Sequence, residues 1–405
     1  MDAIALAIPF FFLLIGIELA WSAWSGRRVY RFNDLISNMG CGIGSQVVGA
    51  FTKTVIFAVY LWVYEYRLFT LAPTALTWVV AFVLVDLLYY WFHRLSHEVN
   101  FLWAAHVVHH QSEEYNLSVA LRQSWWQGVF SWWFYVPLAL CGIHPMIIVT
   151  VGAVNTLYQF WIHTKAIDRL GPLEWILNTP SHHRVHHGSD PIYLDRNHAG
   201  TLIIWDKLFG TFQREEQEPI YGITNQLRTW DPLKANFSYW GELFALAGRA
   251  ATWREKILVF LKPPGWQPAS LGGFQAPVQK DRMTYRKFDT QVPRSWVWLA
   301  ASQFMLLVAV TAYFLFLQAT LSVSIQWVLG ALIIWWVMDL GVMMEGLTWS
   351  LVSEIMRSMV LILVIISIGL GPMMIGMIVI AALLVIPTAS LIWSRRPLRG
   401  YTIWT

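Results

Sequence analysis

Long apolar stretches recur along this chain, and they constrain its fold more than any other feature of the sequence. A helix of about 20 apolar residues crosses the hydrocarbon core of a bilayer, where no water satisfies backbone polar groups. The composition agrees, because 57% of the 405 residues are hydrophobic and only 13% are charged. We therefore expect an all-α integral membrane protein with about nine transmembrane helices, at residues 3–22, 40–64, 75–92, 125–142, 146–163, 296–318, 323–345, 356–371 and 373–393.

The basic residues predict how these spans are oriented. No basic residue precedes the first apolar stretch, while Arg27, Arg28 and Arg31 follow it, which is typical of a retained anchor rather than a cleaved signal peptide. Lys and Arg are enriched in cytoplasmic loops. The loop 93–124, the segment 164–295 and the tail at 394–396 should then be cytoplasmic, in a cell inner membrane or the endoplasmic reticulum. The net charge of +4 reflects this topology, and we expect no nucleic-acid binding.

A long polar segment divides the chain. Residues 164–295 separate five predicted spans from four, and their end, "KPPGWQPASLGGFQAPVQ", is rich in Pro and Gly, as linkers are. We expect a membrane-embedded catalytic domain with a polar cap at 1–260, a linker at 261–295 and a bundle of about four helices at 296–405. All twelve histidines lie between His93 and His198, so any metal chemistry belongs to the first domain. Two cysteines are too few for a disulfide framework.

The histidines are clustered at a spacing typical of metal ligands. "HRLSH", "HVVHH" and "SHHRVHH" place imidazoles three or four residues apart, so that they share one face of a helix. Neutral imidazole is the commonest protein metal ligand. A lone histidine at a membrane interface is more often a packing residue, but packing does not explain three clusters together. The expected ligands are His93, His97, His106, His109, His110, His183, His186 and His187, with His163 from "YQFWIHT" as a ninth.

So many histidines exceed the needs of one tetrahedral ion, and we therefore expect two metal ions on the cytoplasmic side. Mg²⁺ and Ca²⁺ prefer oxygen ligands, which leaves iron, zinc or copper. Zinc has no accessible redox change, although it could replace iron in recombinant protein. His198 is expected to support the ligands, His182 could be a ligand or a neighbour of one, and His144 should lie on the opposite side of the membrane.

Further polar residues are candidates for catalysis or binding. Asp86 lies on the same helical face as His93, and a carboxylate at membrane depth is costly enough to need a purpose. It could orient the metal ligands or bond Tyr90. Glu98 follows the first cluster, and a solvated helix end is the alternative for it. We expect Asp339 and Glu345 to pack helices, with a role in substrate access as the alternative. Asn116, Arg122 and Gln123, in "NLSVALRQS", could bind a lipid headgroup or a cofactor, and Arg122 could instead be an interfacial anchor.

Several motifs resemble a known family. "HRLSH", "HVVHH" and "HHRVHH", followed by "NHAGTLIIWDKLFGTF", resemble the integral-membrane fatty acid hydroxylase and sterol desaturase superfamily. Within it, "FLWAAHVVHHQSEEYNLSVALRQSWWQ" and "GPLEWILNTPSHHRVHHG" are similar to the alkylglycerol monooxygenases, the branch that cleaves ether lipids. The resemblance is densest over residues 79–212. It implies a di-iron centre held by the histidines, O2 and a membrane lipid as substrates, and a tetrahydropterin as the reductant.

The resemblance also bears on single residues. It implies that Glu98 supports pterin use. Two positions depart from the family pattern: Asp168 stands where some members have a further histidine, and His198 stands where an aromatic residue is frequent.

Two other functions remain open from the sequence. The first keeps the di-iron site but makes the chain a sterol or acyl-lipid hydroxylase or desaturase, fed by a ferredoxin or cytochrome as a partner electron donor. The second is a metal transporter or store. Transporters place their ligands near the bilayer midplane, whereas these histidines lie at span ends and in a polar segment, which argues against transport.

Overall fold

The computed structural model describes residues 3–368, and these residues form helices and loops with no β-strand. The predicted all-α class is confirmed for this part of the chain. The two predicted spans at its end, 356–371 and 373–393, lie partly and wholly outside the described residues. The α-helices are α1 (Ala3–Ser25), α2 (Phe32–Glu65), α3 (Ala75–Glu98), α4 (Asn100–Ala104), α5 (Gln127–Ser131), α6 (Val136–Leu140), α7 (Pro145–Trp161), α8 (Pro180–His186), α9 (Ile204–Phe209), α10 (Pro232–Arg249), α11 (Trp253–Leu261), α12 (Arg294–Leu317), α13 (Val323–Met344) and α14 (Trp349–Ile368).

Six of these helices are long and apolar enough to cross a membrane, so the chain is an integral membrane protein, but the count of nine spans is not confirmed. The six candidates are α1, α2, α3, α12, α13 and α14. The expected span at 125–142 is not among these candidates, and this region forms α5, the 3₁₀ turn Trp132–Tyr135 and α6 in succession. The expected span at 146–163 is the 17-residue helix α7, which lies at the short limit for a bilayer-crossing helix and is not among the six candidates.

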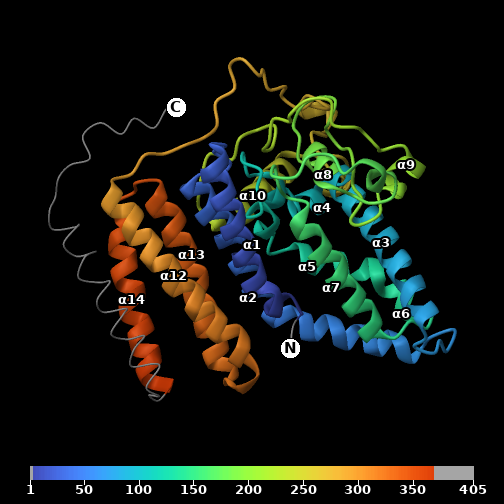
Figure 1. The fold of residues 1–405 in the computed structure, drawn as a ribbon, viewed down its shortest axis with the longest axis horizontal. Coiled ribbons are helices and arrows are strands. Elements are labelled where there is room, and N and C mark those ends of the chain that lie inside the picture. Colours follow the sequence, from blue (N-terminus) through green and yellow to red (C-terminus); the bar gives the residue numbers. More distant parts are fainter. Residues whose placement is uncertain (1–2, 369–405) are drawn as a thin grey trace.

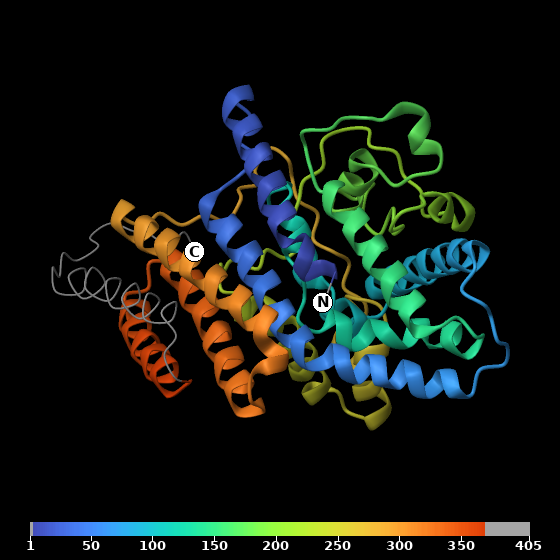
Figure 2. The same ribbon diagram turned by 60° about the horizontal axis from the view of Figure 1, so that its bottom comes forward.

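The helices are arranged as two membrane bodies beneath one polar cap. Figure 1 shows α12, α13 and α14 side by side at one flank, α3 and α7 at the other, and α4, α8, α9 and α10 gathered at one end. Figure 2 shows α2 crossing the molecule from the C-terminal bundle to the loop that leads into α3. The largest apolar core joins α2 to this bundle, with Leu307, Ile333 and Trp336 completely buried. This core fixes the bundle against the part of the chain that carries the histidines.

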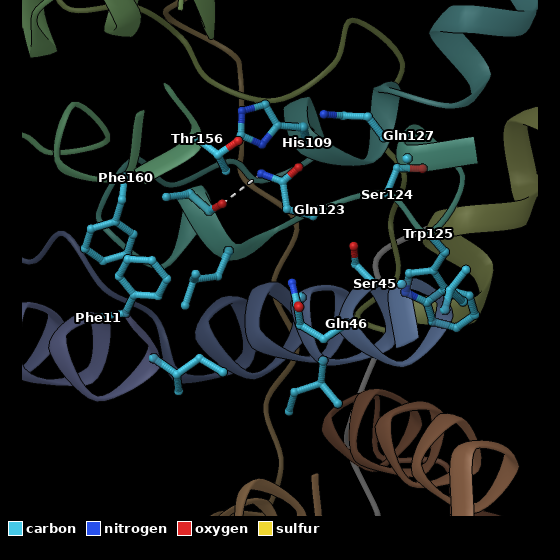
Figure 3. A pocket seen from close by; sticks show the side chains of 18 of the residues that line it. Phe11, Ser45, Gln46, His109, Gln123, Ser124, Trp125, Gln127, Thr156 and Phe160 are labelled. Atoms are coloured by element: carbon cyan, nitrogen blue, oxygen red, sulfur yellow. Dashed lines mark hydrogen bonds between the residues drawn. The ribbon is translucent and has the colours of Figure 1, made fainter. Parts of the chain in front are cut away.

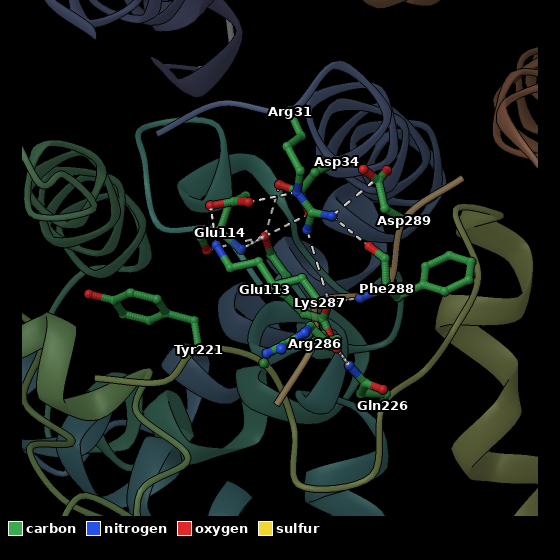
Figure 4. Close-up of polar contacts among 12 residues, drawn as sticks. Arg31, Asp34, Glu113, Glu114, Tyr221, Gln226, Arg286, Lys287, Phe288 and Asp289 are labelled. Atoms are coloured by element: carbon green, nitrogen blue, oxygen red, sulfur yellow. Dashed lines mark hydrogen bonds and ion pairs between the residues drawn. The ribbon is translucent and has the colours of Figure 1, made fainter. Parts of the chain in front are cut away.

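The expected linker is held against the cap by ion pairs. We call residues 262–293 the strap, because they run from α11 over the cap to α12. Glu114 accepts from Arg31 Nε and from Lys287 Nζ, both at 2.6 Å, and Glu113 accepts from the backbone N–H of Phe288 at 2.6 Å. Figure 4 shows these groups converging on Arg31, at the start of α2. The division into domains at 260 and 295 stays a prediction.

Candidate metal centre

Nine buried histidines lie in two adjacent groups. In each group one atom from every histidine can be chosen so that all of them lie within 4.8 Å of one another. Ring centroids of His110 and His187, one from each group, are 4.5 Å apart. The first group is His93, His97, His106, His110 and His186, and the second is His109, His163, His183 and His187. These are the nine expected ligands, and their role as ligands stays a prediction.

Four separate segments carry the nine histidines. The last turns of α3 and of α8 each place histidines on one face, and His163 lies just beyond the end of α7. The "HVVHH" segment is a 3₁₀ turn, Val107–His110, rather than an α-helix. It divides its histidines between the groups, with His106 and His110 in the first and His109 in the second. Each group therefore combines histidines that are distant in the sequence.

Hydrogen bonds to acceptors fix the tautomer of most of these rings. The Nδ1 atoms of His93, His109, His163 and His186 lie 2.7–3.1 Å from the backbone carbonyls of His198, Arg122, Gln159 and Arg196, respectively. The Nδ1 of His106 lies 2.9 Å from Oε1 of Gln127. A carbonyl oxygen only accepts, so each Nδ1 must carry the proton. The Nε2 lone pairs are then free for a metal.

The Nε2 atoms converge on one another and lack other donors. His93 Nε2 lies 3.0 Å from His106 Nε2, and His163 Nε2 lies 3.0 Å from His183 Nε2. The buried Nε2 atoms of His97 and His186 have no hydrogen-bond partner in the described part of the chain. Lone pairs that face each other at this distance repel unless a cation lies between them. The orphaned nitrogens therefore fit a metal in each group.

Burial keeps the cap histidines neutral. It lowers the pKa of His106 to about 3, with a further lowering by the neighbouring His97. Burial also lowers the pKa values of His110 and His187 well below the usual range, and the adjacent histidines add to this effect. A metal ligand must be deprotonated. These rings are therefore available to bind a metal across the neutral pH range.

The three other histidines lie outside both groups. His198 offers its backbone carbonyl to His93, and its own Nε2 is 3.1 Å from the carbonyl of Asp195. His182 stacks edge-on against Phe212, with 5.4 Å between ring centroids. The side chain of His144 caps the start of α7, at the end of this helix that is far from His163. These positions agree with a supporting role for His198.

Asp86 is completely buried and contacts no histidine ring. Its carboxylate accepts hydrogen bonds from Asn155 Nδ2 at 2.6 Å, from the backbone N–H groups of Thr201 and Leu202, and from Trp205 Nε1. Tyr90, the partner considered from the sequence, bonds Thr211 instead. Asp86 therefore holds the loop after His198, whose carbonyl orients His93. This makes it a positioning residue rather than a group that touches substrate.

The four other predicted binding residues are placed differently from one another. Glu98 is 45% exposed and pairs with Arg94 at 2.8 Å. Asn116 is buried and bonds the carbonyl of Val29 and Ser118. Arg122 uses Nε, Nη1 and Nη2 to bond Val108, Ser37, Asn38 and Gln111. Only Gln123 of this set lines the cavity beside the histidines. Asp168, where a further histidine could have stood, is exposed near Arg184.

A cavity of about 330 Å³ opens from the histidines into the membrane region. His106, His109 and His163 form one wall, and the other walls come from α1, α2, α7 and α12. Figure 3 shows Ser45 and Gln46 projecting from α2 toward Gln123 and His109, while Phe11 and Phe160 stack on one another at another wall. The cavity therefore combines amides close to the candidate metal centre with apolar side chains.

Sequence reasoning missed some residues that shape this site. Gln127, which orients His106, had no motif to single it out. The glycines of "GCGIG" were a usable signal, because a Cβ on Gly42 would lie 2.4 Å from the carbonyl oxygen of Leu121, and one on Gly44 would lie 2.3 Å from the Trp125 ring. They allow α2 to pack closely against the segment that contains Gln123. Glu18, buried in α1, was also missed, and it bonds Thr164, next to His163.

Comparisons with known proteins agree with this geometry. Residues 78–211 match the fatty acid hydroxylase family model. The chain is 46% identical over 275 residues to alkylglycerol monooxygenase of Homo sapiens and 44% identical over 274 residues to that of Xenopus tropicalis, with 66% of this chain and 60% of each relative covered. It is 28% identical over 202 residues to an ornithine lipid hydroxylase of Rhizobium tropici, covering 47% of this chain and 59% of the relative. No solved structure matches it significantly.

The chain thus contains a fatty acid hydroxylase domain and resembles alkylglycerol monooxygenases along 66% of its length. It spans about 60% of the length of these curated relatives. The resemblance expected from the histidine motifs is confirmed.

Proposed function

We propose, from the fatty acid hydroxylase domain at residues 78–211 and the similarity to alkylglycerol monooxygenases, that this chain is a membrane monooxygenase that cleaves ether lipids. The observation that carries the proposal is the cavity of about 330 Å³ that joins the two histidine groups to the membrane helices. A lipid chain can reach the histidines along this cavity without crossing water. A metal transporter would not need such a cavity.

We assign one iron ion to each histidine group. Iron is redox-active and suits imidazole ligands, and it would supply the O2-activating chemistry. The residues of the chain hold the ligands in place for it. The carbonyls of His198, Arg122, Gln159 and Arg196 and the amide of Gln127 keep Nδ1 protonated, so that Nε2 faces each metal.

An ether lipid fits the chemistry of the cavity. The carbon next to an ether oxygen has a weakened C–H bond, and its hydroxylation gives a hemiacetal that collapses to a fatty aldehyde and a free glycerol hydroxyl. The amides of Gln46 and Gln123 lie in the cavity that His109 lines and can bind glycerol oxygens there. The Phe11 and Phe160 rings, stacked at 4.2 Å, offer an apolar wall for the alkyl chain. These side chains orient the lipid.

We further propose that a tetrahydropterin is the reductant, and that the cap faces the cytoplasm, where the reductant is available. The carboxylate of Glu98 is half-exposed at the end of α3, next to His97, so it can accept a hydrogen bond from a pterin amino group. A sterol or acyl-lipid hydroxylase fed by a protein donor is the second candidate. The lower identity to an ornithine lipid hydroxylase, 28% against 44–46%, favours the ether lipid.

The deciding experiment supplies membranes that contain the protein with an alkylglycerol and O2, with and without tetrahydropterin. We expect fatty aldehyde to form only when both the lipid and the pterin are present. Glu98→Ala should raise the KM for the pterin while the metal content stays unchanged. Turnover driven by ferredoxin alone, with no aldehyde and no effect of Glu98→Ala, would favour the second candidate.

A further inference from the structure

The C-terminal bundle contributes one face of a helix to the cavity of the candidate active site. Val308, Thr311, Ala312 and Leu315 of α12 line the same cavity as His106, His109 and His163. Their spacing of three and four residues places them on one side of the helix. This part of the chain lies well outside residues 78–211, which match the hydroxylase family model. The bundle therefore does more than anchor the protein.

Thr311 is the one polar residue among these four, and its hydroxyl has no hydrogen-bond partner in the described part of the chain. Its side chain is 6% exposed, and no hydrogen bond to its Oγ1 exists within the described residues. Threonine in a membrane helix usually bonds the carbonyl one turn earlier. A buried hydroxyl without a partner destabilises the protein, so a ligand in the cavity that bonds it would remove this penalty.

The remaining positions on this face are suited to a lipid. Val308, Ala312 and Leu315 are partly buried and apolar, and the small side chain of Ala312, next to Thr311 in sequence, leaves room in the cavity. On a different side of the same helix, Ala309 is exposed and does not line the cavity. The two sides of α12 thus separate a surface that faces the cavity from a surface that faces the membrane.

We propose that α12 is a wall of the lipid-binding site, and that the Thr311 hydroxyl binds an oxygen of the glycerol ether. This inference rests on the proposed function for the identity of the lipid. It assigns a role in substrate binding to the C-terminal bundle, with Thr311 as a specificity residue and Ala312 as the position that keeps the cavity open.

Cross-linking tests the proposal without turnover. An alkylglycerol with a diazirine close to the ether oxygen should, after illumination, label the peptide that contains residues 308–315. Excess unlabelled alkylglycerol should suppress this labelling. If wild-type protein is labelled there but forms no aldehyde, the site stands and the proposed function fails. If it forms aldehyde but α12 is not labelled, the inference about α12 is wrong.

Substitutions on the two sides of α12 give a kinetic test. Ala312→Trp should fill the cavity and raise the KM for alkylglycerol by at least about tenfold, while Ala309→Trp, the same change at an exposed position that does not line the cavity, should leave it unchanged. Thr311→Val should raise the KM several-fold with kcat nearly unchanged, and Thr311→Ser should restore it. Equal KM values for Ala312→Trp, Thr311→Val and wild type, at matched metal content, would overturn the proposal.

Discussion

At the scale of single residues, the histidines act as a set because second partners fix their orientation. Replacement of His110 with alanine removes one candidate ligand from the first group, and replacement of His187 removes one from the second. We expect each variant to lose turnover and about one of two bound metal ions, while it remains in the membrane, since the spans do not depend on the site. Metal analysis and aldehyde formation at matched protein levels check this. His144→Ala, at the far end of α7, is the control and should retain both metals and activity.

The orienting groups should matter almost as much as the ligands. Gln127 holds Nδ1 of His106 through its amide oxygen at 2.9 Å. Gln127→Leu keeps the size of the side chain but removes this acceptor, so we expect metal affinity to fall by about 10–100-fold. Titration of the metal-free protein with Fe²⁺ measures this. Gln318→Leu, which removes a bond to the carbonyl of Ala50 instead, should leave the affinity unchanged.

The sequence indicates which histidines lie close together, but it does not indicate how they are divided between the two groups. Clusters at spacings of three and four predicted eight of the nine members of the two groups, and the ninth, His163, was predicted from its place at the end of an apolar stretch. The spacing argument assumed helices, yet His109 and His110 lie in a 3₁₀ turn and belong to different groups. The group to which each histidine belongs depends on how α3, α7 and α8 pack against one another. Local patterns carry no information about such packing, and they also could not reveal Gln127.

At the scale of elements, most of the long apolar stretches in the described residues form the long helices predicted for them, but one does not. The helices α1, α2, α3, α12 and α13 cover predicted stretches. The apolar stretch 125–142 instead forms short pieces around Pro137, which has no N–H to donate. Trp126 packs at the cap against Phe237 in α10. Hydropathy cannot distinguish such an apolar wall beside the site from a transmembrane helix.

Gly341 allows α13 to pack closely against the cap. A Cβ at this position would lie 2.5 Å from the carbonyl oxygen of Trp230 and 2.7 Å from Cα of Asp231. Gly341→Val should therefore destabilise the protein by about 1–3 kcal/mol, because backbone atoms cannot move aside as a flexible side chain could. Thermal unfolding in detergent measures this. Gly16→Val, where a Cβ would meet no atom within 4 Å, should unfold near the wild-type temperature; equal losses for both variants would contradict the argument.

At the scale of the whole molecule, the cap, the strap and the bundle are parts of one site. The strap, expected as a linker, is fixed to Glu113 and Glu114 in the segment that follows His110. It leads directly into α12, whose Thr311 face lines the cavity. The histidine cap and the membrane bundle are thus connected both through the chain and through the cavity. Composition identified the strap as rich in Pro and Gly, but it could not reveal the long-range ion pairs and hydrogen bonds that hold the strap in place.

The same architecture predicts the topology of the protein. The cap lies at one end of the membrane helices, and the turn after α6, which contains the exposed Cys141, lies at the other end. From the positive-inside rule, we predict that the cap faces the cytoplasm. In sealed right-side-out vesicles, a membrane-impermeant maleimide should label Cys141 without permeabilisation. In a Cys141→Ser background, Met283→Cys, at a strap position that is 83% exposed, should be labelled only after permeabilisation. Cys41 is completely buried and should not react in either case. Labelling of the strap in intact vesicles, with Cys141 protected, would place the histidines outside the cell and would exclude a cytoplasmic reductant.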